Sequence, residues 1–172
     1  MKNRVSLSLL AILVVALASF AFISSKPSTA TSEHGIKWLT FEEVAKLQKK
    51  TKKKIVMDVY TDWCGWCKRM DATTFSDPTV GEYVNKNYYA LKLNAESKKL
   101  IKFNGKEMTE QELAARFGVT GYPTTVYLDE NMEILSPVSG YLDVKQFTNV
   151  VKFYGENHYK SMNFEQFVQS AK

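Results

Sequence analysis

Cysteine and histidine are scarce in this chain, whose 172 residues include two of each. The cysteines are Cys64 and Cys67, and the histidines, His34 and His158, lie near opposite ends of the sequence. A structural zinc site needs four ligands, and these residues do not have the spacing of a ligand set. Covalent haem attachment would need a histidine directly after the second cysteine, where Lys68 stands. The sequence therefore predicts no metal site and no cofactor.

A strong charge of either sign is also missing, because the formal net charge is only +5. The densest basic run, residues 49–54, has no aromatic side chains beside it on which bases could stack. It is more typical of the end of a solvated helix, and we predict no nucleic-acid partner. The hydrophobic content of 45% is sufficient for the core of one ordinary α/β domain.

The N-terminus has the pattern of an export signal. Lys2 and Arg4 precede an apolar run over residues 5–23, with small residues suited to cleavage at 16–18 and 19–21. No cysteine follows directly, which excludes lipid attachment at a cysteine. An uncleaved anchor is the alternative, because the run approaches the length that spans a bilayer. We expect an extracytoplasmic protein, periplasmic or secreted, that contacts a membrane only through this segment if it is uncleaved.

The domain organisation follows from these patterns. Residues 1–25 are predicted to be the signal peptide or N-terminal anchor, residues 26–35 a polar linker, and residues 36–172 one folded domain.

The two cysteines lie between a predicted strand and a predicted helix. Residues 54–60 are mostly apolar and β-branched, as in a buried strand, and helix formers follow Cys67. At a helix start, the helix dipole and the free backbone N–H groups stabilise a thiolate. An inert disulfide is the alternative, but so short a loop would add little stability. The pattern favours redox chemistry, with Cys64 as the nucleophile and Cys67 as the resolving thiol.

Three separated motifs resemble the thioredoxin superfamily over about residues 36–154. "VMDVYTDWCGWCK" is similar to the family's strand and Trp-Cys-x-x-Cys-Lys signature, and "LKLNAE" is similar to its next strand. "ARFGVTGYPTTVYLDENMEIL" resembles the segment that carries the family's cis-proline. "FSDPTV" is most similar to secreted thioredoxin-like proteins and to the periplasmic domains of membrane reductant conductors. The resemblance implies an α/β thioredoxin fold, a central mixed sheet flanked by helices, here with a short extra C-terminal helix.

The sequence departs from the family pattern in two places. The dipeptide between the cysteines is Gly-Trp rather than Gly-Pro, and residues 95–108 are extra. The extra segment contains an Asn104-Gly105 turn signal and is predicted to form a small surface hairpin. We interpret it as a tolerated insertion, with partner docking as the alternative.

The resemblance also implies roles for individual residues. Asp58 stands six residues before Cys64, where thioredoxins keep a buried acid, and Lys92 matches its partner lysine. Asp58 would accept the proton of Cys67, directly or through a water. A buried aspartate paired with Lys92 is the structural interpretation, and the two are compatible.

A substrate-binding surface is implied around the cysteines. Pro123 matches the cis-proline, beside which an extended substrate chain could pair with the backbone of Tyr122 as an added strand. Trp63 is expected to pack mostly beneath the loop, and Trp66 to shape the docking surface. The predicted substrate-binding residues are Trp63, Gly65, Trp66, Tyr122 and Pro123.

Periodicity and capping patterns predict the remaining elements. They are a short strand at 36–38, a helix opened by a capping box at 40–43, a helix from 77–78 to about 86, a strand at 88–94, a helix from 109 to 117, strands at 124–128 and 133–138, a helix from 143 to 154, and a last helix from 163.

Together these features predict an enzyme, a thiol–disulfide oxidoreductase that acts on protein disulfides. We expect a reductase, recharged by a membrane electron carrier. The alternatives are a disulfide oxidase or isomerase, and a non-catalytic binding module that uses the same fold.

Overall fold

The structure is a computed structural model, and it describes residues 35–170. The predicted signal or anchor segment and nearly all of the predicted linker lie outside these residues. Within residues 35–170, no helix is long and apolar enough to cross a membrane.

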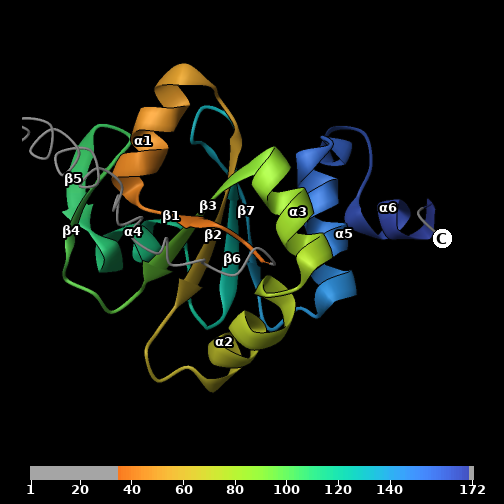
Figure 1. The fold of residues 1–172 in the computed structure, drawn as a ribbon, viewed down its shortest axis with the longest axis horizontal. Helices are drawn as coiled ribbons and strands as arrows, with labels where there is room; N and C mark the ends of the chain where they lie inside the picture. Colours follow the sequence, from red (N-terminus) through yellow and green to blue (C-terminus); the bar gives the residue numbers. More distant parts are fainter. Residues whose placement is uncertain (1–34, 171–172) are drawn as a thin grey trace, which may run out of the picture. The chain divides into compact units, whose positions relative to one another are not determined.

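A five-stranded mixed sheet forms the centre of the domain (Figure 1). Its strand order is β1 (Trp38–Leu39), β3 (Tyr88–Asn94), β2 (Lys54–Tyr60), β6 (Thr124–Leu128) and β7 (Ile134–Ser139). The first three strands are parallel, and β6 and β7 are antiparallel to their neighbours. Strand β2 lies in the middle and is buried on both faces, which explains its nearly continuous apolar sequence.

Two sets of helices cover the sheet (Figure 1). One face packs against α1 (Phe41–Lys50), α4 (Glu110–Arg116) and the hairpin of β4 (Leu100–Phe103) and β5 (Lys106–Thr109). The other face packs against α2 (Gly65–Met70), its π-helical continuation η2 (Asp71–Phe75), α3 (Pro78–Asn87) and α5 (Val144–Gly155). A 3-10 turn, η3 (His158–Lys160), leads to the last helix, α6 (Phe164–Ser170).

Successive side chains of β2 point alternately to the two faces of the sheet and so belong to different cores. Ile55, Met57 and Val59 belong to the core under α1 and α4, whereas Val56 belongs to the core under α3 and α5. Successive side chains of a strand point to opposite faces, so Asp58 lies on the same face as Val56. A carboxylate therefore occupies a core-facing position just before the strand ends.

Local signals position the helices as the sequence predicts. The side chains of Thr40, Thr109 and Asp143 each form a capping box at the start of α1, α4 and α5. Asp77 caps α3, whose first residue is Pro78. The last helix, α6, places Phe167 against Phe153 of α5, with 5.6 Å between the ring centroids.

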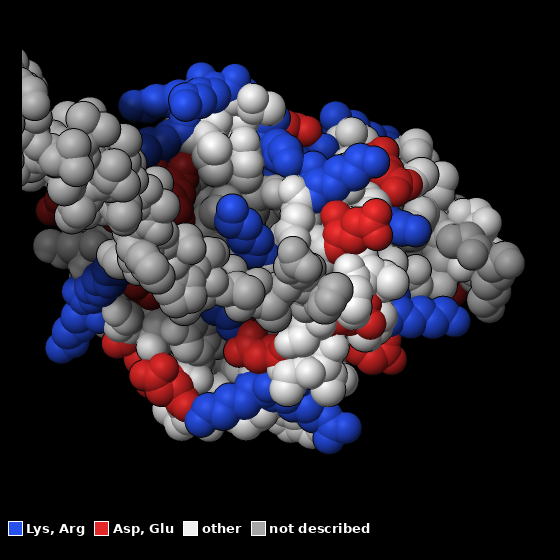
Figure 2. All heavy atoms as spheres, viewed as in Figure 1, with Lys and Arg blue, Asp and Glu red and all other residues white. Residues whose placement is uncertain are grey.

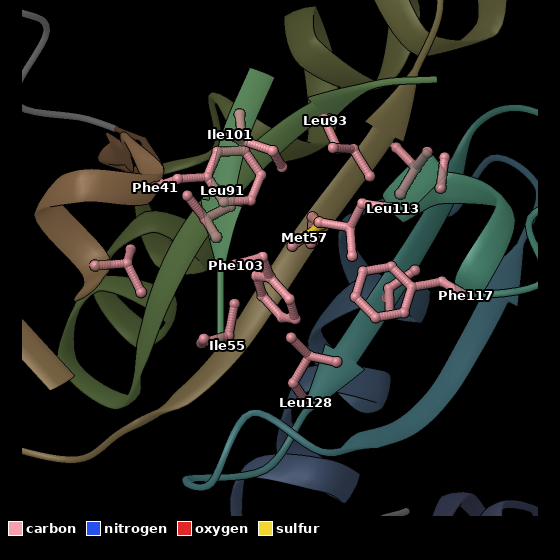
Figure 3. Close-up of a cluster of buried hydrophobic side chains, with 14 of the residues drawn as sticks. Phe41, Ile55, Met57, Leu91, Leu93, Ile101, Phe103, Leu113, Phe117 and Leu128 are labelled. Carbon is pink, nitrogen blue, oxygen red and sulfur yellow. The ribbon is translucent and has the colours of Figure 1, made fainter. Parts of the chain in front are cut away.

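The extra segment forms the predicted hairpin, but the prediction of a surface position is wrong in one respect. Ile101, Phe103 and Met108 are buried in the core with Phe41 and Leu91. Figure 3 shows Ile101 and Phe103 in this cluster. Alternation explains the difference, because the opposite side chains of the hairpin face solvent while these three point inward. The hairpin is therefore part of the core under α1.

Candidate active site

The two cysteines form a disulfide at the start of α2, with an S–S distance of 2.04 Å. Cys64 is the N-cap of the helix, and the N–H of Cys67 donates a hydrogen bond to Cys64 Sγ at 3.0 Å. The N–H of Cys64 donates to the carbonyl oxygen of Thr61, which turns the chain from β2 into the helix. The sulfur of Cys64 thus already occupies the position of an N-cap acceptor.

Both cysteines are nearly covered in this disulfide-bonded state. Cys64 is 4% exposed and Cys67 is 3% exposed. The surface beside the disulfide is therefore not formed by the sulfur atoms. Exposure lies instead in the flanking side chains, since Trp63 is 66% exposed and Trp66 is 57% exposed.

Asp58 lies at the end of β2 and is only 1% exposed. Its Oδ2 accepts a hydrogen bond from Lys92 Nζ at 3.0 Å, because the two residues are register partners on adjacent strands. Its Oδ1 has no hydrogen-bond partner among the described residues. Burial raises the pKa of Asp58 to about 6, although the nearby ammonium of Lys92 acts in the opposite direction.

Lys92 connects this buried acid to the surface. Its ammonium also binds Asp71, a half-exposed carboxylate of η2. The rings of Trp38 and Tyr60 lie 4.9 and 5.1 Å from Lys92 Nζ, within the range of cation–π attraction. Burial acts to lower the pKa of Lys92, but the two carboxylates outweigh it and raise the pKa. Lys92 is held as a cation between two acids.

Trp63 is anchored from the segment that follows β3. Its indole Nε1–H donates to both carboxylate oxygens of Glu96, each at 3.0 Å. Its ring also meets Tyr122 edge to face, with centroids 5.9 Å apart. The expectation that Trp63 packs mostly beneath the loop is therefore wrong, because these two contacts hold it at the surface.

Trp66, which lies between the two cysteines in the sequence, has a different set of contacts. Its ring is 5.4 Å from that of Tyr141, and the guanidinium of Arg69 lies over both rings at 5.5 and 5.9 Å. The hydroxyl groups of Tyr141 and Thr73 are hydrogen-bonded at 3.1 Å. Two separate aromatic pairs, each with one charged partner, thus border the cysteines.

Three further predicted residues complete this surface. The Tyr122–Pro123 peptide bond is cis, Tyr122 is half-buried and Pro123 is buried. The carbonyl oxygen of Pro123 accepts a hydrogen bond from the N–H of Gly140 at 2.8 Å. Gly65 is exposed, and a Cβ placed there would meet nothing within 4 Å among the described atoms.

Sequence reasoning missed three residues that contact the predicted ones. Asp71 follows Cys67 by four residues, a spacing that places both on one face of a helix, so periodicity could have indicated it. Glu96 and Tyr141 reach the site from distant segments, and nothing in their local sequence indicates these contacts. Within residues 35–170, no group of three or more potential ligand side chains could hold a metal ion.

Comparisons with known proteins agree with this geometry. The protein-family model of the thioredoxin-like domain matches residues 41–155, about two thirds of the chain. The chain belongs to this thioredoxin-like family. This match confirms the resemblance to the thioredoxin superfamily that the sequence motifs indicate. It also confirms the prediction of an α/β thioredoxin fold.

The chain is similar to thiol:disulfide interchange proteins DsbD. The protein of Actinobacillus pleuropneumoniae is 31% identical over 149 residues, which are 80% of this chain and 24% of the relative. The protein of Pectobacterium atrosepticum is 30% identical over 129 residues, which are 70% of this chain and 21% of the relative. The chain therefore spans less than a quarter of the length of these relatives.

Solved structures share the fold of this thioredoxin-like chain. A thioredoxin-fold protein from Helicobacter pylori has a TM-score of 0.61 at 22% identity and covers 69% of this chain and 80% of its own. A thioredoxin from Thermus thermophilus has a TM-score of 0.53 at 22% identity and covers 75% of this chain and 99% of its own. At these identities the similarity concerns the fold alone.

Proposed function

We propose that this chain is a thiol–disulfide oxidoreductase that exchanges disulfides with proteins through Cys64 and Cys67. The observation that carries the proposal is the Cys64–Cys67 disulfide at the start of α2, with a backbone N–H directed at Cys64 Sγ. A thiolate in that position would receive the same hydrogen bond and the favourable end of the helix dipole. Membership of the thioredoxin-like family and the names of the DsbD relatives support the assignment.

The exchange runs in two steps when the chain acts as a reductant. The thiolate of Cys64 attacks one sulfur of a substrate disulfide, and the other substrate sulfur leaves as a thiolate. Cys67 then loses its proton and attacks Cys64 Sγ, which releases the second substrate sulfur. Two electrons pass from the cysteine pair to the substrate, and the pair is left as the disulfide.

We assign to Asp58 the role of general base that accepts the proton of Cys67. With a pKa of about 6, its carboxyl changes protonation near neutral pH, where a general base is most effective. Its Oδ1 is free of other hydrogen bonds within the described part of the chain. Lys92 acts as a positioning residue, since it binds Oδ2 and links it to Asp71.

The substrate would bind between the two tryptophans. Trp63 with Tyr122 forms one wall and Trp66 the other, while the exposed Gly65 leaves room above the disulfide. An extended chain could pair beside Pro123 with the backbone of Tyr122. We assign substrate binding to this surface.

Location and direction complete the proposal. Lys2, Arg4 and the apolar run at 5–23 support export, so we place the protein outside the cytoplasm as a reductase recharged by a membrane electron carrier. Fractionation of the native host tests the location, and full-length soluble protein in the cytosol would contradict it. A redox titration of the cysteine pair tests the direction, because a potential as oxidising as that of a disulfide oxidase is incompatible with a reductase.

Trapping of mixed disulfides tests the chemistry. Cys67→Ser should capture disulfide-linked proteins on Cys64, because attack remains possible and resolution does not. Cys64→Ser is the matched control and should capture few. Each variant is pulled down under non-reducing conditions after thiols are blocked at lysis. Equal capture by both variants would show that Cys64 is not the nucleophile or that the pair is not catalytic.

A further inference from the structure

A groove lies between α1 and the β4–β5 hairpin, and none of the candidate active-site residues lines it. Its volume of about 730 Å³ is within the range of about 300–1,000 Å³ that small-molecule sites occupy. The groove is built partly by the extra segment, because residues 102–105 form one of its sides. We call it the α1–hairpin groove.

The floor of the α1–hairpin groove is apolar. Phe41, Val44, Leu91 and Phe103 line it, and all four belong to the core cluster under α1. Figure 3 shows the side chains of Phe41, Leu91 and Phe103 gathered from α1, β3 and the hairpin. Because these side chains are packed against one another, the floor is preformed. These four side chains are only 1–8% exposed, so the floor presents a ligand with the edges of Phe41 and Phe103.

The rim of the groove is basic. Lys46 and Lys49, one helical turn apart on α1, line it together with Lys52 and Lys102. Glu42 is the one acidic residue among the described lining residues. Figure 2 shows lysine and arginine side chains gathered over the end of α1.

The cationic groups of this rim have few partners of their own. Within residues 35–170, no ion pair involves Lys46, Lys49 or Lys102, whereas Lys52 Nζ donates to Asn131 Oδ1 at 2.8 Å. A lysine can lay its aliphatic stem along an apolar surface and keep its ammonium at the edge. The groove thus combines an apolar floor with cationic groups able to bind an anion.

We propose that the α1–hairpin groove binds a single-chain anionic amphiphile, of which a fatty-acid carboxylate is the simplest. The acyl chain would lie along the groove against the exposed edges of Phe41 and Phe103 and against the partly buried Met132, and the carboxylate would be bound by Lys49 and Lys102. The charge of the rim selects an anionic head group, the floor selects an alkyl chain, and the volume fits one such molecule. The proposal does not depend on the redox chemistry of the cysteines.

Decanoate is the probe, because it is monomeric at the concentrations used, and calorimetric titration of the full chain measures its affinity. Acetate, with the same head group and no chain, should not bind. Decanol, with a similar chain and no charge, should bind at least about tenfold more weakly, since the charge-assisted contacts are lost. Because the full chain retains its apolar N-terminus, the decisive comparison is between variants that differ only at the groove.

Two variants and a matched control locate the site. Ala45→Trp places a large side chain at an exposed position of α1 that lines the groove, and should abolish binding. Lys49→Gln combined with Lys102→Gln should weaken binding about tenfold by removing two cationic contacts. Lys50→Gln removes a neighbouring exposed lysine that does not line the groove and should leave affinity within about twofold.

The outcomes that overturn the proposal are defined in the same way. Equal affinity of wild type and Ala45→Trp would place decanoate elsewhere, and equal affinity for decanoate and decanol would remove the role of the lysines. If soluble oligoglutamate displaced decanoate as effectively as dodecanoate does, binding would depend on the positive charge alone and not on an alkyl chain. Circular dichroism checks that each variant is folded. Mixed-disulfide trapping by Cys67→Ser is measured separately, so failure here leaves the redox proposal unaffected.

Discussion

Asp58→Asn is expected to raise the stability of the fold and to slow disulfide exchange, so that its two effects have opposite signs. The pKa of Asp58 is raised from 3.8 to about 6, mainly because the side chain is buried. Each pKa unit corresponds to about 1.36 kcal/mol, so ionisation of the buried carboxyl costs roughly 3 kcal/mol at neutral pH. Asparagine has nearly the same shape and carries no charge, which removes this cost.

The pH dependence of this effect has a definite sign. Because the folded pKa lies above the unfolded one, proton binding stabilises the fold. That contribution is complete below about pH 4 and is lost as the pH rises to about 6. The variant should therefore match the wild type near pH 4 and exceed it by about 1–3 kcal/mol near pH 8. The range extends below 3 kcal/mol because the substitution leaves Lys92 with only Asp71 as an ionic partner.

Urea unfolding of the oxidised proteins at about pH 4, 6 and 8 measures this difference. Asp62→Asn, at an exposed position of the neighbouring loop, is the matched control and should change stability by less than about 0.5 kcal/mol at each pH. Turnover with a protein disulfide is measured in parallel and should fall for Asp58→Asn near neutral pH. A stability difference that does not vary with pH, or a variant less stable than wild type at pH 8, would refute the reasoning.

Two further substitutions test other parts of the structure. Phe103→Ala should lower the free energy of unfolding by about 3–5 kcal/mol, because it leaves a cavity in the core under α1. Leu100, on the same hairpin, is 61% exposed, so Leu100→Ala should lower it by less than about 1 kcal/mol. Urea titration measures both changes. Asp71→Asn should lower the pKa of Asp58, because it removes a negative charge that raises it. NMR titration of the Asp58 carboxyl carbon measures that shift, and an unchanged or higher pKa would contradict the ion-pair chain through Lys92.

The elements that sequence reasoning placed best are those with strong local signals. The predicted strands at 54–60, 88–94 and 124–128 agree with β2, β3 and β6 residue for residue. Nearly every residue of these strands is buried, which favours mostly apolar side chains along them. Capping boxes at Thr40, Thr109 and Asp143 likewise identified helix starts, because side chain and backbone satisfy each other within four residues.

For strands with weaker local signals, the predicted bounds differ from the observed ones by one or two residues. The first strand lies at Trp38–Leu39 rather than at 36–38, and β7 lies at Ile134–Ser139 rather than at 133–138. Both are edge strands, whose ends are decided by pairing with a single neighbour. Their bounds follow from tertiary register and not from their own residues.

The residues of the candidate site also differ in how far the sequence could predict them. The cysteines are indicated by their own motif, and Asp58 and Lys92 by the resemblance to the thioredoxin superfamily. In the structure, the last two are hydrogen-bonded to each other. The exposure of Trp63 was not predictable, because it depends on Glu96, which lies 33 residues away in sequence. A contact of this kind follows only from the three-dimensional arrangement.

The buried hairpin sets a limit on how the length of this chain could change. A loop that only spans a gap can be shortened at small cost, but the hairpin of β4 and β5 contributes Ile101, Phe103 and Met108 to the core. Deleting it would leave Phe41 and Leu91 without the neighbours that cover them. Insertions should be tolerated at the exposed Asn104–Gly105 tip and deletions should not, so this extra segment belongs to the smallest unit of the chain that can fold.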